Sequence, residues 1–329
     1  MSNSPSSGGA PGTADFRKSP LLFDLTGRAA IAVSGRDRGE FLHGLLTNDV
    51  KKLRPGDGCA AALLTPKGKM RADLVVLCRE EELVLDAEAA LSRPLDAMLR
   101  GYVFFQQVTV ENRTDVTVVL HVEGTGAGEI LRKVIGQGGP VEPHGNVNVA
   151  GTVVVRESRG GFEGFDLRVA RGDVGSLRAS LLSAGAVPAD PFLLESARIE
   201  AGIPRWGAEL TEAVLPDEAG LTTRGWVSYT KGCYIGQETV ARIRTYGHVN
   251  RSLVGLLLPD GEAPAPGTDV LLGAQKAGEV TSAVRSARLS RVVALAYVHR
   301  DHAEPATSLS VSLPGASAEA VVTSFPIDG

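Results

Sequence analysis

The stretch KGCYIGQETVAR, residues 231–242, places Cys233 between two glycines and beside Lys231. The run QETVARIR is typical of the start of a helix, and GWVSYT before it reads as a strand, so Cys233 is predicted in the loop that precedes a helix N-terminus. A helix dipole and a nearby lysine both favour a thiolate over a thiol. The alternative is a structural thiol buried in a tight turn, and the residues alone leave both possibilities open.

Polar and basic side chains follow this cysteine. Gln237 and Glu238 fall in the first turn of the predicted helix and are expected to face the same cleft as Cys233. Arg242 and Arg244 lie just downstream. A solvated basic face explains these arginines plainly, whereas a ligand with several carboxylates would use their bidentate geometry.

Composition limits the classes of function. The chain has 329 residues, of which 43% are hydrophobic and 22% charged, as in a soluble globular protein of two or three domains. A net charge of −4 gives no basic footprint for direct binding of nucleic acid. No apolar run is long enough to span a membrane, which predicts no membrane partner.

The cysteines and the N-terminus suggest where the protein works. Three cysteines, far apart in the chain, argue against a disulfide framework and favour the cytoplasm. No CxxC or HExxH pair occurs, so the sequence predicts no metal site. Residues 1–20 open with a Ser/Gly/Pro-rich run and are predicted to be a disordered tail.

The order of predicted elements suggests two α/β units followed by a β domain. The second unit covers roughly residues 112–188. A helix within residues 190–210 is predicted to end at Gly202 and Pro204. After residue 248 the texture changes to short apolar strands separated by Gly/Pro turns, which predicts a small β-barrel over residues 249–329.

Three further stretches carry candidate site residues. LTNDV holds Asn48 at a predicted helix end, where it either caps the helix or lines a cleft. LTPKGKMRADL is a predicted hairpin in which Asp73 stands among apolar residues and needs a partner if it is buried. ARIEAGIPRWG carries Arg198 and Glu200, for which a structural ion pair is the default role, and Trp206, which either caps a core edge or stacks on a flat ring.

The octapeptide KGCYIGQE resembles the signature of the YgfZ-type folate-binding branch of the glycine-cleavage T-protein (aminomethyltransferase) family. FLHGLLTNDV, LTPKGKMRADL and ARIEAGIPRWGAEL resemble the same branch in the same order, and the similarity spans roughly residues 21–329. The resemblance implies an α+β fold: two interleaved ferredoxin-like α/β units around a central cavity within residues 21–248, plus the C-terminal small β-barrel.

The resemblance also implies a ligand and a role. Tetrahydrofolate, or a one-carbon derivative, is expected in the central cavity. The expected function is support of the assembly or repair of iron–sulfur enzymes and, through them, of tRNA modification; the expected partners are those enzymes or cluster-assembly proteins. The alternative function is a folate-dependent aminomethyltransferase or demethylase, so whether this chain is an enzyme stays open at this point.

The residue roles follow from that resemblance. Cys233 and Lys231 match the functional cysteine and lysine of the branch, and Asp73 is the candidate proton-transfer group. The residues expected to bind the folate are Arg198, Glu200, Trp206, Gln237, Glu238, Asn48 and Arg242. The T-protein proper has paired aspartates where this chain has RADL, so Ala72 replaces one of them.

Overall fold

The computed structural model describes residues 15–328. Most of the predicted disordered tail, residues 1–14, lies outside this range. Its remainder, residues 15–20, is not disordered. Phe16 is buried, and its ring stacks on Phe162 and Phe23 with centroid distances of 5.0 and 5.8 Å. The prediction was wrong here because Phe16 completes a small apolar cluster with Leu21 and Phe23.

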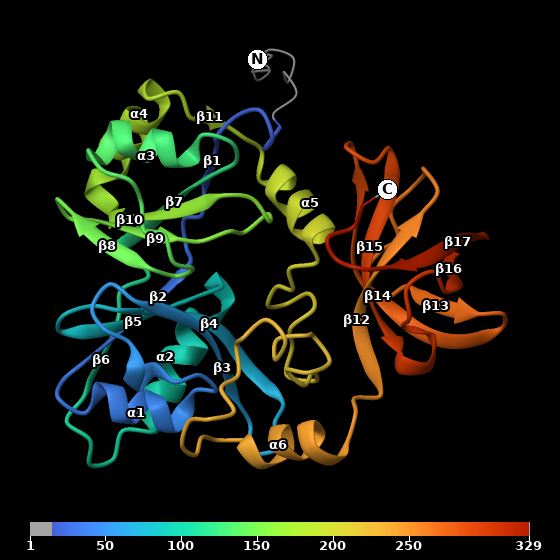
Figure 1. Cartoon of the computed structure of the whole chain (residues 1–329), viewed down its shortest axis with the longest axis horizontal. Helices are drawn as coiled ribbons and strands as arrows, with labels where there is room; N and C mark the ends of the chain where they lie inside the picture. Colours follow the sequence, from blue (N-terminus) through green and yellow to red (C-terminus); the bar gives the residue numbers. More distant parts are fainter. Residues whose placement is uncertain (1–14, 329) are drawn as a thin grey trace, which may run out of the picture.

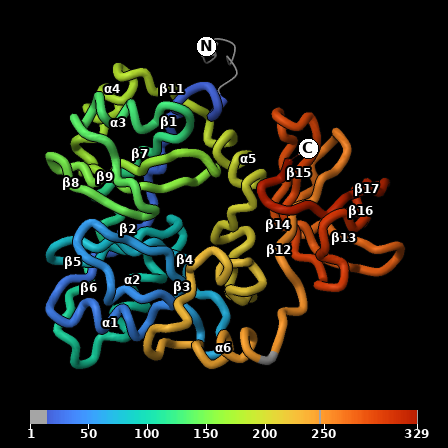
Figure 2. The backbone as a smooth tube through the Cα atoms, in the orientation of Figure 1, coloured from blue at the N-terminus to red at the C-terminus, as the bar shows by residue number. Residues whose placement is uncertain are grey.

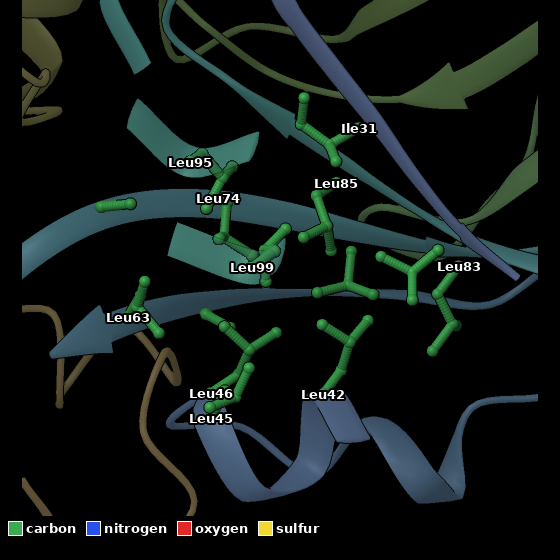
Figure 3. Packing of buried hydrophobic residues seen from close by; sticks show 14 of the residues in the cluster. Ile31, Leu42, Leu45, Leu46, Leu63, Leu74, Leu83, Leu85, Leu95 and Leu99 are labelled. Atoms are coloured by element: carbon green, nitrogen blue, oxygen red, sulfur yellow. The ribbon is translucent and has the colours of Figure 1, made fainter. Parts of the chain in front are cut away.

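The first sheet has five strands in the order β3-β4-β5-β2-β6, and each neighbouring pair is antiparallel. Two helices cover one of its faces, and the leucines of α1 and α2 pack there against alternate residues of the strands (Figure 3). The elements of this unit are β2 (Ala29–Ser34), α1 (Arg38–Leu45), β3 (Gly58–Leu64), β4 (Met70–Cys78), β5 (Glu82–Ala87), α2 (Ser92–Gly101) and β6 (Thr109–Asn112).

The second sheet has six strands in the order β11-β1-β7-β10-β9-β8. Helices α3 and α4 cover its outer face through a separate apolar cluster. The first strand of the chain, β1, pairs with β7 and β11 of this second sheet rather than with the first, so the two units are interleaved. The elements are β1 (Leu21–Asp24), β7 (Thr117–Glu123), α3 (Ala127–Ile135), β8 (Asn146–Val149), β9 (Thr152–Arg156), β10 (Gly164–Ala170), α4 (Val174–Ser183) and β11 (Val187–Pro188).

The two sheets lie face to face, with each helix pair on the outside (Figure 1). Part of the contact between them is hydrocarbon, because Val75 and Leu77 of β4 pack against Val155 of β9. Side chains alternate along a strand, so the residues of β4 that flank these two, such as Leu74 and Val76, point to the helices instead. Asp73 therefore shares the inter-sheet face with Val75.

A helix and a long irregular segment join the sheets to the C-terminal domain. Helix α5 (Pro191–Ala201) ends at Gly202, as predicted, because Gly202 adopts a left-handed φ of 68°. The following chain crosses the first unit and leads to α6 (Gln237–Tyr246), which begins where the sequence predicted. GWVSYT is a loop and not the predicted strand. The amide of Trp226 donates to the carbonyl of Leu221 and that of Ser228 to the carbonyl of Thr47, so neither takes part in a sheet.

The C-terminal domain is a closed barrel in the strand order β12-β15-β14-β13-β16-β17. It packs beside α5, and the backbone trace runs from α6 directly into β12 (Figure 2). The predicted fold class, two α/β units plus a small C-terminal barrel, is confirmed. The strands are β12 (Arg251–Leu258), β13 (Asp269–Leu272), β14 (Gln275–Ser286), β15 (Arg291–His299), β16 (Ser308–Leu313) and β17 (Ala316–Thr323).

Candidate functional site

A cavity of about 620 Å³ lies between the sheets, next to their apolar contact. Its walls come from β4, β5, the segments after β1 and β9, helix α5 and the irregular segment beyond it. The side chains that give it its chemistry are Arg28, Asp73, Asp86, Glu88, Arg159, Glu195, Arg198, Arg205, Phe192 and Trp226. A cavity of this size with a few convergent polar groups is typical of a small-molecule site.

Asp73 is the unusual group in this wall. Its Oδ1 is shielded from solvent and has no hydrogen-bond partner among residues 15–328. Burial, reinforced by the negative charge of Glu88, raises the pKa of Asp73 to about 7 against a weaker opposing effect of Arg28. A carboxyl group with a pKa near neutrality can both hold and release a proton at physiological pH, which is what a general acid or base needs.

Arg28 and Asp86 form the paired charges next to Asp73. Arg28 reaches both oxygens of Asp86, at 3.0 Å from Nε and 2.7 Å from Nη2, and its Nη1 lies 2.7 Å from Glu88. Burial would raise the pKa of Asp86, but the guanidinium groups of Arg168, Arg28 and Arg159 outweigh it and hold that pKa well below its usual range. Asp86 is therefore a fixed anion and Asp73 a titratable one.

Arg159 closes the wall from the second sheet. Its Nε lies 3.0 Å from Asp166 Oδ1 and its Nη2 2.5 Å from Asp166 Oδ2. Asp166 is buried and also contacts His121 and Arg168, so it does not line the cavity itself. Asp166 thus fixes Arg159, which does line it.

Arg198 holds the wall that faces the barrel. The guanidinium donates to Glu195 at 2.6 and 2.8 Å, to Glu209 at 2.9 Å and to Ser282 of β14 at 3.0 Å. Glu195 also receives Arg205 at 3.4 Å. One arginine of α5 therefore connects the cavity to the barrel.

The remaining predicted residues of these stretches lie elsewhere. Glu200 binds Ser286 and Arg288 of the barrel domain at 2.7 Å each. Trp206 packs against the apolar clusters of the first unit, and Trp226 lines the cavity instead. Asn48 donates to the carbonyls of Ala60 and Gly225 and so ties the irregular segment to the first sheet. The structure thus brings only Asp73 and Arg198 of the predicted set together in the cavity wall.

The Cys233 loop forms a second, separate region. Cys233 is exposed, as are Glu238 and Arg242, and neither these three nor Gln237 lines the cavity. Lys231 is buried, and its Nζ donates to the carbonyls of His43 and Leu46 at 2.5 Å each, at the C-terminal end of α1. Burial lowers the pKa of Lys231 to about 8. Lys231 was expected to stabilise a thiolate at Cys233. In the structure its ammonium donates to backbone carbonyls at the end of α1.

Several residues of the cavity escaped the sequence analysis, namely Arg28, Asp86, Arg159, Glu195 and Trp226. Part of the signal was available: ELVLDA places Asp86 inside an apolar strand, and VVLHVEG and GFDLRVA do the same for Glu123 and Asp166, which hold Arg159. A charged residue in such a strand is buried only with a partner. Which charges pair could not be read, because the partners come from strands of two different sheets.

Further properties of the described part bear on the class of protein. No helix of residues 15–328 is long and apolar enough to cross a membrane. Within the same range no group of three or more His, Cys, Asp or Glu side chains is arranged to hold a metal ion.

Comparison with known proteins identifies the family. The model of the GCVT N-terminal domain matches residues 12–227, and that of the glycine cleavage T-protein C-terminal barrel domain matches residues 251–328. An aminomethyltransferase of Shouchella clausii is 31% identical, over 94% of this chain and 87% of the relative, and one of Geobacillus kaustophilus is 30% identical, over 93% and 86%.

A solved structure shares the fold. The crystal structure of the glycine cleavage system aminomethyltransferase T from Bartonella henselae superposes with a TM-score of 0.87 at 23% identity, over 94% of this chain and 87% of that one. The first domain match ends before α6, at residue 227, and the second begins with β12, at residue 251. The chain therefore belongs to the glycine cleavage T-protein (aminomethyltransferase) family.

Proposed function

We propose that this protein binds tetrahydrofolate in the cavity and acts as a folate-dependent one-carbon transferase, either an aminomethyltransferase or a demethylase. The observation that carries the proposal is Asp73, a carboxyl group in the cavity wall with an unpartnered oxygen and a pKa of about 7. Family membership supports the same class of reaction.

The cavity wall fits such a ligand. Its volume of about 620 Å³ lies within the range of small-molecule sites. Phe192 and Trp226 offer aromatic surface for a flat ring system, and Glu195 and Asp73 offer carboxylate oxygens for ring N–H groups. When bound, tetrahydrofolate supplies the nitrogen atoms that carry the one-carbon unit.

The residues of the chain then have distinct roles. Asp73 accepts or returns a proton at the carboxyl oxygen that no group of residues 15–328 engages. The Arg28–Asp86 pair keeps the charge beside Asp73 constant while Asp73 gains or loses its proton. Arg198 orients Glu195 through two hydrogen bonds, and Glu195 orients the ligand.

Calorimetry with tetrahydrofolate tests the ligand, and turnover of a methylamine donor tests the reaction. Asp73→Asn is expected to retain binding and to lower turnover at least about a hundredfold, the usual contribution of a positioned acid or base. Asp260→Asn, which removes an exposed carboxylate paired with Arg285, is the matched control. No heat of binding at tens of micromolar ligand would overturn the proposal.

A second candidate function rests on the Cys233 loop. We propose that the protein is of the YgfZ type and supports cytoplasmic iron–sulfur enzymes, and through them tRNA modification. Two features support this: KGCYIGQE carries the resemblance, and Cys233 is exposed and so accessible to a partner protein. A single thiol does not complete a cluster site, so a partner must supply the other ligands.

Two variants, Cys233→Ala and Asp73→Asn, distinguish the two candidate functions. If iron–sulfur support is the function, Cys233→Ala abolishes rescue of a deletion strain while tetrahydrofolate binding stays at the wild-type level. If transfer is the function, Asp73→Asn abolishes rescue and Cys233→Ala does not. Full rescue by Cys233→Ala would eliminate the thiol role.

A further inference from the structure

His121 is a buried ionisable group for which the proposed reaction has no use. It lies on β7 with no exposed side-chain surface. Its Nδ1 is 2.9 Å from Asp166 Oδ1 and its Nε2 is 2.6 Å from Glu123 Oε2. Ionised carboxylates only accept hydrogen bonds, so both ring nitrogens must donate, and only an imidazolium does that. Burial opposes the charge, but the bonds to Asp166 and Glu123 outweigh it and raise the pKa of His121.

Glu123, the first partner of His121, anchors a loop of the cavity wall. Its carboxylate accepts hydrogen bonds from the backbone amides of Arg159 at 2.9 Å, Gly160 at 2.9 Å and Phe162 at 2.8 Å. These amides belong to the segment between β9 and β10. The backbone of Arg159 is therefore held by a carboxylate that His121 orients.

Asp166, the second partner, holds the side chain of the same arginine. It lies directly opposite His121 in the β7–β10 pairing and accepts from Nε and Nη2 of Arg159. Nη1 of Arg159 is then the guanidinium nitrogen that no carboxylate of residues 15–328 engages. The backbone and the guanidinium of one cavity-wall residue thus depend on two carboxylates, and both carboxylates contact His121.

We propose that His121 is a positioning residue of the cavity: its imidazolium holds Glu123 and Asp166 in place, and these fix Arg159 so that Nη1 faces the ligand. The identity of that ligand, tetrahydrofolate, rests on the proposed function, whereas the arrangement of His121, Glu123, Asp166 and Arg159 does not.

The charges around His121 are balanced only if the ring is protonated. Glu123 faces it from β7, Asp166 and Arg168 from β10, Arg159 from the loop before β10, and the Phe23 ring lies 6.2 Å away on β1. Asp86, Arg28 and Glu88 of the first unit extend the same network. Counting Arg28, Arg159, Arg168 and His121 against Asp86, Glu88, Glu123 and Asp166, a neutral ring leaves an excess negative charge inside the protein.

The first test needs no ligand. The chain has six histidines, so ¹⁵N-histidine labelling gives a readable spectrum. The wild-type protein is expected to show two slowly exchanging ring N–H signals from His121 at pH 7, where an ordinary histidine is mostly neutral. A single ring N–H signal at pH 7 would overturn the inference even if the protein binds folate.

The second test uses His121→Asn, which keeps one donor and removes the charge. Hydrogen exchange at the amides of Arg159, Gly160 and Phe162 is expected to accelerate about tenfold, and tetrahydrofolate affinity to fall about tenfold, as for loss of one charge-assisted hydrogen bond. Barrel amides are expected to exchange as in the wild type. His299→Asn, which removes an exposed histidine beside Asp301, is the control for both readouts.

Each result decides a separate question. Unchanged loop exchange and an affinity within twofold of the wild type would overturn the positioning role, and equal acceleration at all amides would show a purely structural one. If the wild type binds no tetrahydrofolate, the proposed function fails, while the exchange result still judges His121. Should His121→Asn not fold, His121→Gln replaces it: it also keeps one donor and removes the charge, and the same changes are expected.

Discussion

Lys231 is a buried residue and Asp73 a half-buried one with a shielded carboxyl oxygen, and the two polar groups differ in whether the fold supplies a partner. Lys231 reaches two backbone carbonyls at the end of α1, whereas Asp73 keeps an oxygen that no described group engages. The residue in the conspicuous motif is thus satisfied by the fold itself, while the one in an ordinary hairpin is not. An unmet hydrogen-bonding group in a cavity therefore indicates a ligand more directly than an unusual sequence does.

Replacing the ionisable carboxyl group of Asp73 is expected to have the largest effect on stability. Its pKa of about 7 exceeds the ordinary 3.8, so the folded state binds this proton more tightly than the unfolded state does. Its contribution to stability is therefore complete below pH 4 and lost as pH rises through 7, by up to about 4 kcal/mol. Asp73→Asn is expected to lack this loss and to be the more stable protein at pH 8. Urea unfolding of both proteins at pH 5 and pH 8 measures the difference, and an equal gap at both values would contradict it.

Gly236 tests how tightly the Cys233 loop is built. Its φ is 84°, and a Cβ there would lie 2.5 Å from the carbonyl oxygen of Thr65. Gly236→Ala is therefore expected to lower the free energy of unfolding by about 2–3 kcal/mol through backbone strain and the clash. Gly261→Ala, where a Cβ meets nothing within 4 Å, is the control. Equal thermal unfolding temperatures for the two variants would show that the loop shifts to accommodate the methyl group.

Lys231→Met keeps the aliphatic stem and removes the ammonium. Two carbonyls at the end of α1 then lose their donor, so the free energy of unfolding is expected to fall by about 2 kcal/mol. Lys52→Met provides the comparison, because that side chain is 73% exposed. A loss no larger than that of the control, in chemical denaturation at pH 7, would mean that water replaces the ammonium.

Cys233→Ala should have the smallest effect on stability. The side chain is exposed, so the change in free energy of unfolding is expected to stay within about 0.5 kcal/mol. Thermal unfolding measures it. A loss above about 1 kcal/mol would place the sulfur in the packing of the loop and weaken the case for a reactive thiol.

The sequence predicted elements whose signals are local. The end of α5 at Gly202 and the start of α6 at Gln237 depend on neighbouring residues, and the barrel strands are marked by turns within a few positions. The resemblance supplied the two units and the cavity. Asp73 could be singled out because a carboxylate between apolar residues of one strand is visible in the sequence.

The rest of the site depends on distance in the chain. Arg28 and Asp86 are 58 residues apart, and Arg159 reaches Asp86 across 73. No local pattern connects such residues, because their proximity follows from how two sheets stack. Glu200 was assigned to the ligand from the family resemblance, and only the packing of α5 shows that it faces the barrel.

The placement of β1 has a consequence for synthesis of the chain. Leu21 pairs with Glu123, so this strand leaves the ribosome about a hundred residues before its partner. The second sheet cannot be completed from its own contiguous stretch, and a fragment starting after residue 24 would leave the β7 edge open to association with other chains. The N-terminal strand can therefore pair only after β7 has been synthesised. The two units are expected to fold together rather than one after the other.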